Sequence, residues 1–477
     1  MIDRRTLLAA SAAALIAPPA RGEAPAADLA GDITILRQAL QLHPGLYRYS
    51  SPREVEARLV ALERDFPAAP SLEARYLLLS HFLATIRCGH SYCNFFNQTK
   101  AVAAALFDRP TRLPFRFGWV AGRMIVLADD SGTAKLPRGT EIVGVNGLPA
   151  RRMLAALMPY ARADGHNDAK RVSLLEVRGE DGIEFFDVFQ GLVLPPQGST
   201  HRLMIRRPGG PIERVEVPAI GLTERRKAMT PAREVVWDWT MRPDGVALLT
   251  MPGWALYNSK WDWRGWLDER LASLAGAKGL VVDLRENEGG EDCGDALLAR
   301  LADRPLVIAG RERRLRFRRT PPALDRYLDT WDQSFRRLGE DAEPLGDGWY
   351  RQTGAMADDS IAPAAPRLTL PVAALIGPVN SSATFGFAEK AKASGLVRLF
   401  GQTTGGNRRG INGGCYFFVR LPASGIEFDL PLIGYYSTVP QPDAGILPDV
   451  AVAPSVADIA AGRDPTLEAA AAWCRTA

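Results

Sequence analysis

The sequence has no large excess of charge of either sign. Its 58 lysines and arginines face 54 aspartates and glutamates over 477 residues, which leaves a net charge of +4. A chain so nearly balanced gives no electrostatic reason to invoke nucleic acid, and we find no RNA- or DNA-binding motif in it. We therefore expect no nucleic-acid partner. The length exceeds what one compact core usually holds, which predicts two or three domains.

Long apolar runs are also missing. The run from Leu7 to Ala17 is too short to span a bilayer, and no other segment is long and apolar enough. This run follows Arg4 and Arg5 and precedes prolines and small residues, which is the layout of a twin-arginine secretory signal. Ala24-Pro25-Ala26 offers a cleavage site. Residues 1–26 are therefore predicted to be a signal peptide, and the mature protein is predicted to be periplasmic or secreted, without stable membrane insertion.

Cysteine and histidine are scarce, with five of each. An oxidising compartment permits disulfides, and the odd count leaves at least one cysteine unpaired within the chain. Cys88 and Cys93 are close enough in sequence to form a bridge. Together with His90 they also offer three possible zinc ligands, but no fourth ligand is evident nearby. We expect no metal and no other cofactor.

The chain divides into three regions after the signal. Residues 27–107 show apolar residues at helical spacing, with Ser71 as a candidate N-cap, and predict a helical domain. Residues 110–225 contain short apolar runs broken by glycine and proline, which predict hairpins and a β-rich module. Residues 235–470 alternate buried strands with helices, which favours a largely parallel sheet covered by helices. Within this region, the stretch Asp325–Pro366 looks like an inserted helix and loop.

Two turns in the third region carry residues suited to catalysis. In GPVNSSAT, a buried strand ends and Ser381 and Ser382 open a helix, where free backbone N–H groups and the helix dipole favour a developing negative charge. A simple N-cap is the competing interpretation. In DLRENEGG, a strand runs into Gly289 and Gly290, whose missing side chains allow a substrate carbonyl to approach the backbone.

Taken together, these segments resemble the tail-specific protease and tricorn-core family of serine peptidases. GLVVDLRENEGG is similar to the family's strand and diglycine turn, and VAALIGPVNSSATFGFAEKA to its nucleophile strand and helix. LFGQTTGG and GILPDVAV resemble two later motifs of the family, in the same order. The resemblance implies an α/β catalytic domain of ClpP/crotonase-like type and a polypeptide substrate. LPRGTEIVGVNGLPA is similar to part of the PDZ-like module that often precedes this domain.

The resemblance also implies a set of catalytic residues. Ser382 matches the nucleophile, and the backbone N–H groups of Ala383 and of Gly289 or Gly290 would form the oxyanion hole. The Ser–Lys branch of the family places its lysine where this sequence has Asn407.

The tricorn-like branch uses a histidine instead, which His90 matches in FLATIRCGHSYCNF. Histidine is suited to take and return a proton near neutral pH. Asp443 is the acid nearest the position of the third member, with Ser91 as a weaker polar candidate. His43 and His166 are assigned no catalytic role.

Two other readings stay open at this point. The absence of the family's lysine allows a catalytically inactive protein of the same fold that only binds peptides. An acyl-CoA enzyme of the related crotonase architecture fits less well, because that reading leaves the serine turn and the export signal unexplained. The sequence favours an exported serine peptidase over both.

Overall fold

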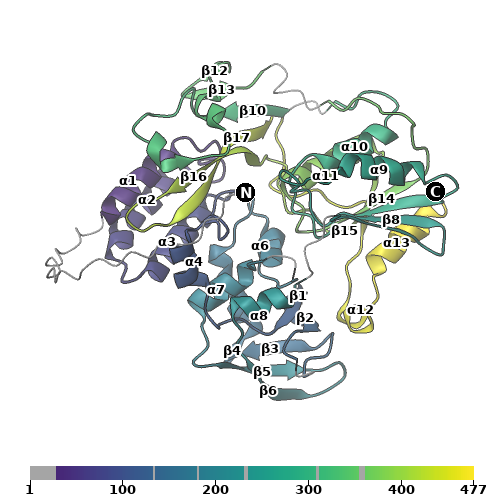
Figure 1. The fold of residues 1–477 in the computed structure, drawn as a ribbon, viewed down its shortest axis with the longest axis horizontal. Helices are drawn as coiled ribbons and strands as arrows, with labels where there is room; N and C mark the ends of the chain where they lie inside the picture. Colours follow the sequence, from purple (N-terminus) through teal and green to yellow (C-terminus); the bar gives the residue numbers. More distant parts are fainter. Residues whose placement is uncertain (1–27, 133–134, 180–181, 230–234, 308–310, 354–359) are drawn as a thin grey trace, which may run out of the picture.

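The computed structural model describes residues 28–477 except 133–134, 180–181, 230–234, 308–310 and 354–359 (Figure 1). The predicted signal peptide lies outside the described residues. None of the described helices is both long and apolar enough to cross a membrane.

The first described region is helical, as the apolar spacing predicts. Ser51 begins α2 with a capping box, in which its hydroxyl accepts from the Glu54 N–H and the Glu54 carboxylate accepts from the Ser51 N–H. Ser71 caps α3 by accepting a hydrogen bond from the Ala74 N–H, which confirms the predicted cap. The helices are α1 (Leu29–Leu40), α2 (Pro52–Ala68), α3 (Leu72–Thr85) and α4 (Lys100–Phe107).

The middle region forms an antiparallel sheet with strand order β1-β2-β3-β5-β6, in which β4 pairs with β3. The predicted hairpins and the turn at Asn146-Gly147 are present, and both turn residues have positive φ angles, 52° and 86°. The strands are β1 (Phe115–Val120), β2 (Arg123–Asp129), β3 (Glu141–Val145), β4 (Leu148–Pro149), β5 (Thr200–Arg206) and β6 (Ile212–Pro218). The helices are α5 (Ala150–Leu157), α6 (Asp168–Leu174), α7 (Phe185–Val193) and α8 (Leu222–Lys227).

A second sheet, with order β18-β15-β14-β9-β8-β7, is parallel except for β7. Its strands have two buried faces: one packs with residues of α9, α10 and α11, and the other with α13 (Figure 1). The strands are β7 (Asp238–Met241), β8 (Val246–Thr250), β9 (Gly279–Asp283), β14 (Val372–Ile376), β15 (Arg398–Gly401) and β18 (Val450–Ala451). The helices are α9 (Trp263–Ala272), α10 (Cys293–Leu301), α11 (Ser382–Ser394), α12 (Val456–Ala461) and α13 (Pro465–Cys474).

A third sheet, with order β11-β16-β17-β10-β13-β12, packs against the N-terminal helices (Figure 1). Phe428 and Leu430 of β17 belong to the same buried core as Leu36 of α1 and Leu83 of α3. The helical region and parts of the third region therefore share one core. The strands are β10 (Arg311–Leu315), β11 (Leu328–Asp329), β12 (Glu343–Gly346), β13 (Trp349–Arg351), β16 (Asn412–Arg420) and β17 (Glu427–Ser437).

The stretch Asp325–Pro366 differs from the helix and loop expected there. Its described residues contribute β11, β12 and β13 to the third sheet, with only two short 3-10 turns, Asp325–Tyr327 and Gln333–Arg337.

Polar contacts also join this sheet to the N-terminal region: the Asp32 carboxylate accepts hydrogen bonds from the N–H groups of Ala423 and Ser424. The N-terminal helices are thereby fixed to a sheet made late in the chain.

Candidate active site

The turn between β14 and α11 is held by a buried asparagine. Asn380 is fully buried, and its Oδ1 accepts a hydrogen bond from the Gly377 N–H at 2.7 Å. Its Nδ2 donates across to Asn287 O at 2.9 Å, in the turn that follows β9. Thr384 Oγ1 donates to the same Asn287 carbonyl at 3.0 Å. The serine turn and the glycine turn are therefore one hydrogen-bonded unit.

The two serines of this turn have different roles. Ser381 is buried, and its Oγ donates to Glu288 O at 3.2 Å. Ser382 opens α11 with φ 51°, a left-handed conformation that costs a non-glycine residue about 1–3 kcal/mol. Among the described residues, Ser382 Oγ has no hydrogen-bond partner. A strained serine with an unengaged hydroxyl at a helix start is the arrangement expected of a nucleophile, and it is Ser382 that has it.

The glycine turn lies directly against Ser382. Gly289 has φ 122°, and a Cβ atom placed on it would lie 2.8 Å from Ser382 Cβ. Gly290 has φ 135°, and a Cβ there would lie 2.2 Å from the Trp254 carbonyl carbon. Both positions therefore exclude a side chain, for conformational and for steric reasons.

Only some of the backbone N–H groups of the two turns are free to donate to a substrate. The Gly289 N–H already donates to Asn287 Oδ1 at 2.9 Å. Within the described part of the chain, the N–H groups of Gly290 and Ala383 have no acceptor, and Ala383 lies in the first turn of α11, where such groups stay unpaired. Of the predicted oxyanion donors, Gly290 and Ala383 are the ones available.

His90 lies on the loop that follows α3, as predicted. Its Nδ1 is buried without a hydrogen-bond partner among the described residues. The adjacent Gly89 N–H donates to Asp164 Oδ1 at 2.9 Å, while Asp164 Oδ2 is likewise buried and unpartnered. Burial lowers the pKa of His90, and the Asp164 carboxylate offsets part of that shift. His90 is therefore neutral near pH 7, the state that a general base requires.

An ion network connects the His90 loop to both turns. Arg162 Nη1 donates to Gly89 O at 2.7 Å and to Glu288 Oε1 at 3.2 Å. The buried Lys170 donates to the same Glu288 oxygen at 2.7 Å and to Val379 O at 2.9 Å. Burial alone would raise the pKa of Glu288, but Lys170 and Arg162 together hold it well below its usual range. The carboxylate of Glu288 thus joins three segments that are far apart in sequence.

In the described part of the chain, the segments that carry Ser382 and His90 are linked through this network and not by a direct hydrogen bond. No hydrogen bond joins Ser382 Oγ to His90 within the described residues. The path between them runs from Ser381 Oγ to Glu288 O, and from the Glu288 carboxylate through Arg162 to Gly89. His90 also interacts electrostatically with Glu288 and Lys170. The loop that carries His90 is therefore tied to the glycine turn by Arg162 and Glu288, whose roles the sequence motifs did not indicate.

Asp443 and His166 are hydrogen-bonded to each other. Asp443 Oδ2 accepts from His166 Nδ1 at 2.7 Å, and Oδ1 accepts from the Asn407 side chain at 2.6 Å. Asn407 Nδ2 also donates to Asp164 O at 3.2 Å. No hydrogen bond links Asp443 to His90 among the residues described. Asp164, which sequence reasoning missed, interacts electrostatically with His90 and accepts a hydrogen bond from the adjacent Gly89 N–H; its only signal was the polar run ADGHNDAKR around His166.

The cysteines near His90 are free and buried. Cys88 Sγ accepts hydrogen bonds from the His90 N–H at 3.4 Å and from Asn412 Nδ2 at 3.3 Å, and Cys93 forms no bridge with it. The described residues contain no group of three or more histidine, cysteine or acidic side chains placed to hold a metal. The zinc reading of Cys88, His90 and Cys93 therefore finds no support.

A cavity of about 440 Å³ opens beside the glycine turn. Gly289 and Val379 line it from the turns that follow β9 and β14, and Lys170 and Phe185 line it from the middle region. Leu256 and Leu174 add apolar walls. A polypeptide bound there would lie between the two regions and against Gly289.

Comparisons with known proteins concern the family and the fold. The model for Peptidase family S41 matches residues 245–452. A structure of mature CPAF complexed with lactacystin is similar at 17% identity over 94% of this chain and 97% of that chain, with a TM-score of 0.65. A second structure of mature CPAF is similar at 16% identity over 94% and 96%, with a TM-score of 0.60. The photosystem II D1 C-terminal processing protease is 14% identical over 93% and 96%, with a TM-score of 0.42. A search of curated protein sequences gave no significant match.

Proposed function

We propose that this chain, a serine-type peptidase whose residues 245–452 belong to peptidase family S41, cleaves polypeptides through an acyl-enzyme on Ser382 with His90 as general base. The observation that carries the proposal is the strained, unengaged Ser382 packed against Gly289. Strain of this kind persists only where surrounding contacts impose it, and Asn380 and Thr384 supply those contacts.

The steps follow from the groups present. Neutral His90 takes the proton of the Ser382 hydroxyl as Oγ attacks the peptide carbonyl carbon. The N–H groups of Gly290 and Ala383 donate to the oxyanion that forms. His90 then gives its proton to the leaving amine as the C–N bond breaks. Water, deprotonated by His90, then attacks the acyl carbon; the bond from that carbon to Ser382 Oγ breaks, His90 returns the proton to Oγ, and the new C-terminal carboxylate product leaves.

We assign the orientation of His90 to Asp164 in place of Asp443. Both His90 Nδ1 and Asp164 Oδ2 are buried and unpartnered, and the Asp164 carboxylate favours the protonated imidazole. A hydrogen bond between these two atoms would satisfy both and would give His90 the orienting acid that a general base of this kind uses. Asp443 contacts Asp164 only indirectly, because the Asn407 side chain donates hydrogen bonds both to the Asp443 carboxylate and to the Asp164 carbonyl.

An active-serine phosphonate probe tests the proposal directly. The intact protein should be labelled at Ser382, because the probe's phosphorus takes the place of the attacked carbonyl. Ser382→Ala should abolish labelling, whereas Ser381→Ala should still be labelled, since Ser381 Oγ is engaged with Glu288 O. Absence of label from the intact, folded protein under all conditions would point to the peptide-binding protein without catalysis.

The pH dependence should follow His90. Catalysis requires the neutral imidazole, and burial lowers the pKa of His90 below its ordinary 6.5. Activity should therefore persist below pH 6.5 and disappear as the pH falls further, through the lowered pKa. The measurement is kcat/KM against pH, which reports the free enzyme. An acid limb centred above pH 7 would contradict the assignment of His90 as base.

Replacement of Asp164 should show whether Asp164 or Asp443 is the acid that orients His90. Asp164→Asn is expected to lower kcat by about 10²–10⁴-fold with little change in KM, because the amide favours the wrong histidine tautomer. Asp443→Asn serves as the matched variant and should lower kcat less than tenfold, since its bonds go to His166 and Asn407. The reverse order of effects would return the role to Asp443.

A further inference from the structure

A cavity of about 400 Å³ lies behind the His90 loop, and its walls are strongly cationic. Three arginines from separate elements line it: Arg58 from α2, Arg87 from the loop after α3, and Arg171 from α6. His81 and His166 add imidazole groups to the same wall. The peptidase mechanism described above uses none of these five side chains.

These arginines are short of acidic partners. Arg87 Nη1 is buried without a hydrogen-bond partner among the described residues. Within the same residues, neither Arg87 nor Arg58 forms an ion pair; Arg58 Nη1 donates to Ser50 Oγ at 2.9 Å. Arg171 pairs with Asp168 at 2.9 Å and also donates to the carbonyls of Ala161 and Met158. The unpartnered atom is therefore Arg87 Nη1, and a charged donor that is shielded from solvent without a partner needs an explanation.

The one carboxylate that lines the cavity is committed elsewhere. Glu54 Oε2 accepts from the backbone N–H and the hydroxyl of Ser51, which completes the cap of α2. Burial lowers the pKa of Arg87, and the nearby charges of Arg171 and Arg58 lower it further, with partial relief from Asp168 and Asp443. The guanidinium groups of Arg58, Arg87 and Arg171 therefore repel one another across the cavity.

We propose that this cavity binds a small oxyanion, a carboxylate or a phosphate, between Arg58, Arg87 and Arg171. Guanidinium groups bind both anions through paired, charge-assisted hydrogen bonds, and the orphaned Arg87 Nη1 supplies a donor that nothing else in the described structure uses. The binding step does not depend on the peptidase chemistry.

The bound anion would act on the base loop. Arg87 precedes Cys88, Gly89 and His90, and its carbonyl accepts a hydrogen bond from the Gly165 N–H at 3.0 Å, beside Asp164. Arg87 itself has φ 61°, which places local strain where the anion would bind. Occupancy should therefore fix the segment that carries both the base and its orienting acid.

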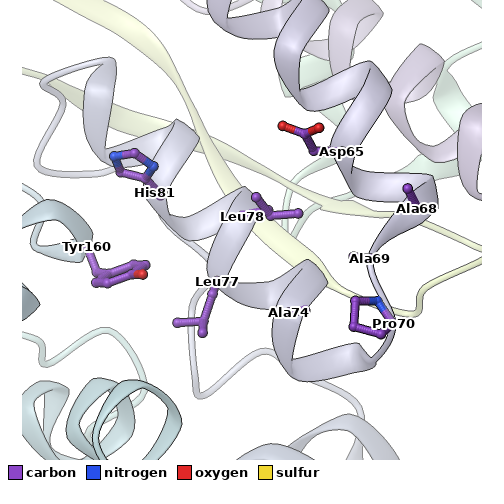
Figure 2. A pocket seen from close by; sticks show the side chains of 9 residues that line it. All are labelled: Asp65, Ala68, Ala69, Pro70, Ala74, Leu77, Leu78, His81 and Tyr160. Atoms are coloured by element: carbon purple, nitrogen blue, oxygen red, sulfur yellow. The ribbon is translucent and has the colours of Figure 1, made fainter.

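A neighbouring groove suggests where a larger ligand would extend. His81 lines the cationic cavity and also a shallow groove of about 370 Å³, whose walls include Leu77, Leu78 and Tyr160 (Figure 2). In Figure 2 His81, Leu77 and Tyr160 lie around the same space. A free phosphate would occupy the cationic cavity alone. The carboxylate of a peptide's C-terminus would carry an apolar side chain into the groove.

The test is calorimetric binding of inorganic phosphate to the full chain at constant ionic strength. Arg87→Gln should weaken binding about tenfold or more, because a paired, charge-assisted contact is lost. Arg64→Gln is the matched control: Arg64 lies on the exposed face of α2 and pairs with Asp65, so phosphate affinity should not change. Equal phosphate affinity of the intact protein and Arg87→Gln, or no binding at all to either anion, would overturn the proposal.

A second arm identifies the source of the anion. In a Ser382→Ala background, a short peptide ending in leucine is compared with its C-terminal amide. Binding of the acid but not the amide, lost in Arg87→Gln, would support the peptide carboxylate; binding of phosphate alone would support a free anion. Should Arg87→Gln fail to fold, Arg58→Gln and Arg171→Gln replace it, and unchanged affinity in both would count against the site.

Discussion

Replacing Ser382 with alanine is expected to lower kcat/KM by at least about 10⁴-fold, the scale at which loss of a serine nucleophile acts in related chemistry. The reason is local: Ser382 alone among the two serines has an unengaged Oγ, at a φ of 51°. The measurement is hydrolysis of an unfolded polypeptide by purified protein, with folding checked by circular dichroism. Because alanine keeps the Cβ atom and therefore the same backbone strain, and Ser382 Oγ makes no hydrogen bond in the described structure, thermal stability should change little.

The neighbouring serine gives the discriminating control. Ser381→Ala removes a hydrogen bond to Glu288 O of about 0.5–1.5 kcal/mol but leaves the nucleophile in place. Activity should therefore fall far less than in Ser382→Ala. If Ser381→Ala were the inactive variant and Ser382→Ala remained active, the assignment of the nucleophile would be wrong.

Gly289→Ala is expected to lower kcat by at least about 100-fold, the effect of losing one oxyanion donor. Its Cβ would lie 2.8 Å from Ser382 Cβ and 3.0 Å from the Ala383 N atom, so Ser382 or the donor must move. Alanine also strains the φ of 122° that Gly289 adopts. We expect the unfolding midpoint to fall as well, and activity should therefore be compared per folded molecule.

Gly386→Ala is the matched control for that substitution. Gly386 lies on the same helix, α11, and a Cβ there meets no atom within 4 Å. Alanine should raise the free energy of unfolding by about 0.5–1 kcal/mol, because glycine weakens helix interiors. Its activity should stay at the level of the unmodified protein. Equal activity of Gly289→Ala and Gly386→Ala would remove the glycine turn from the mechanism.

The parts that the sequence predicts well are local ones. The strands β8, β9 and β14 are continuous apolar runs because both faces of the sheet are covered, and the helices after them begin at turn residues. The glycine turn at Gly289 and the serine turn at Ser382 are short, so a few consecutive residues determine them. The hairpins of the middle region are specified equally locally, by Asn146-Gly147 and by Gly209-Gly210.

The parts that sequence reasoning missed depend on distant pairings. The β16–β17 hairpin joins the N-terminal helices in one core, although nothing in its own pattern names them as partners. The ion network is similar: Arg162 and Lys170 meet Glu288 only after the chain folds. The partner of Asp443 belongs to this class too, since His166 lies 277 residues before it in the sequence. Residue type indicates that a charge needs a partner, but it does not indicate which one.

The shared core of α1–α4 and β16–β17 has a consequence for synthesis of the protein. His90 is made early, yet the sheet that supports its loop leaves the ribosome only after Ser382 has been translated. A growing chain, like a fragment that ends before residue 437, therefore lacks part of the core against which that loop is held. Long-range closure of this kind slows folding, because these contacts form only once the late strands are available.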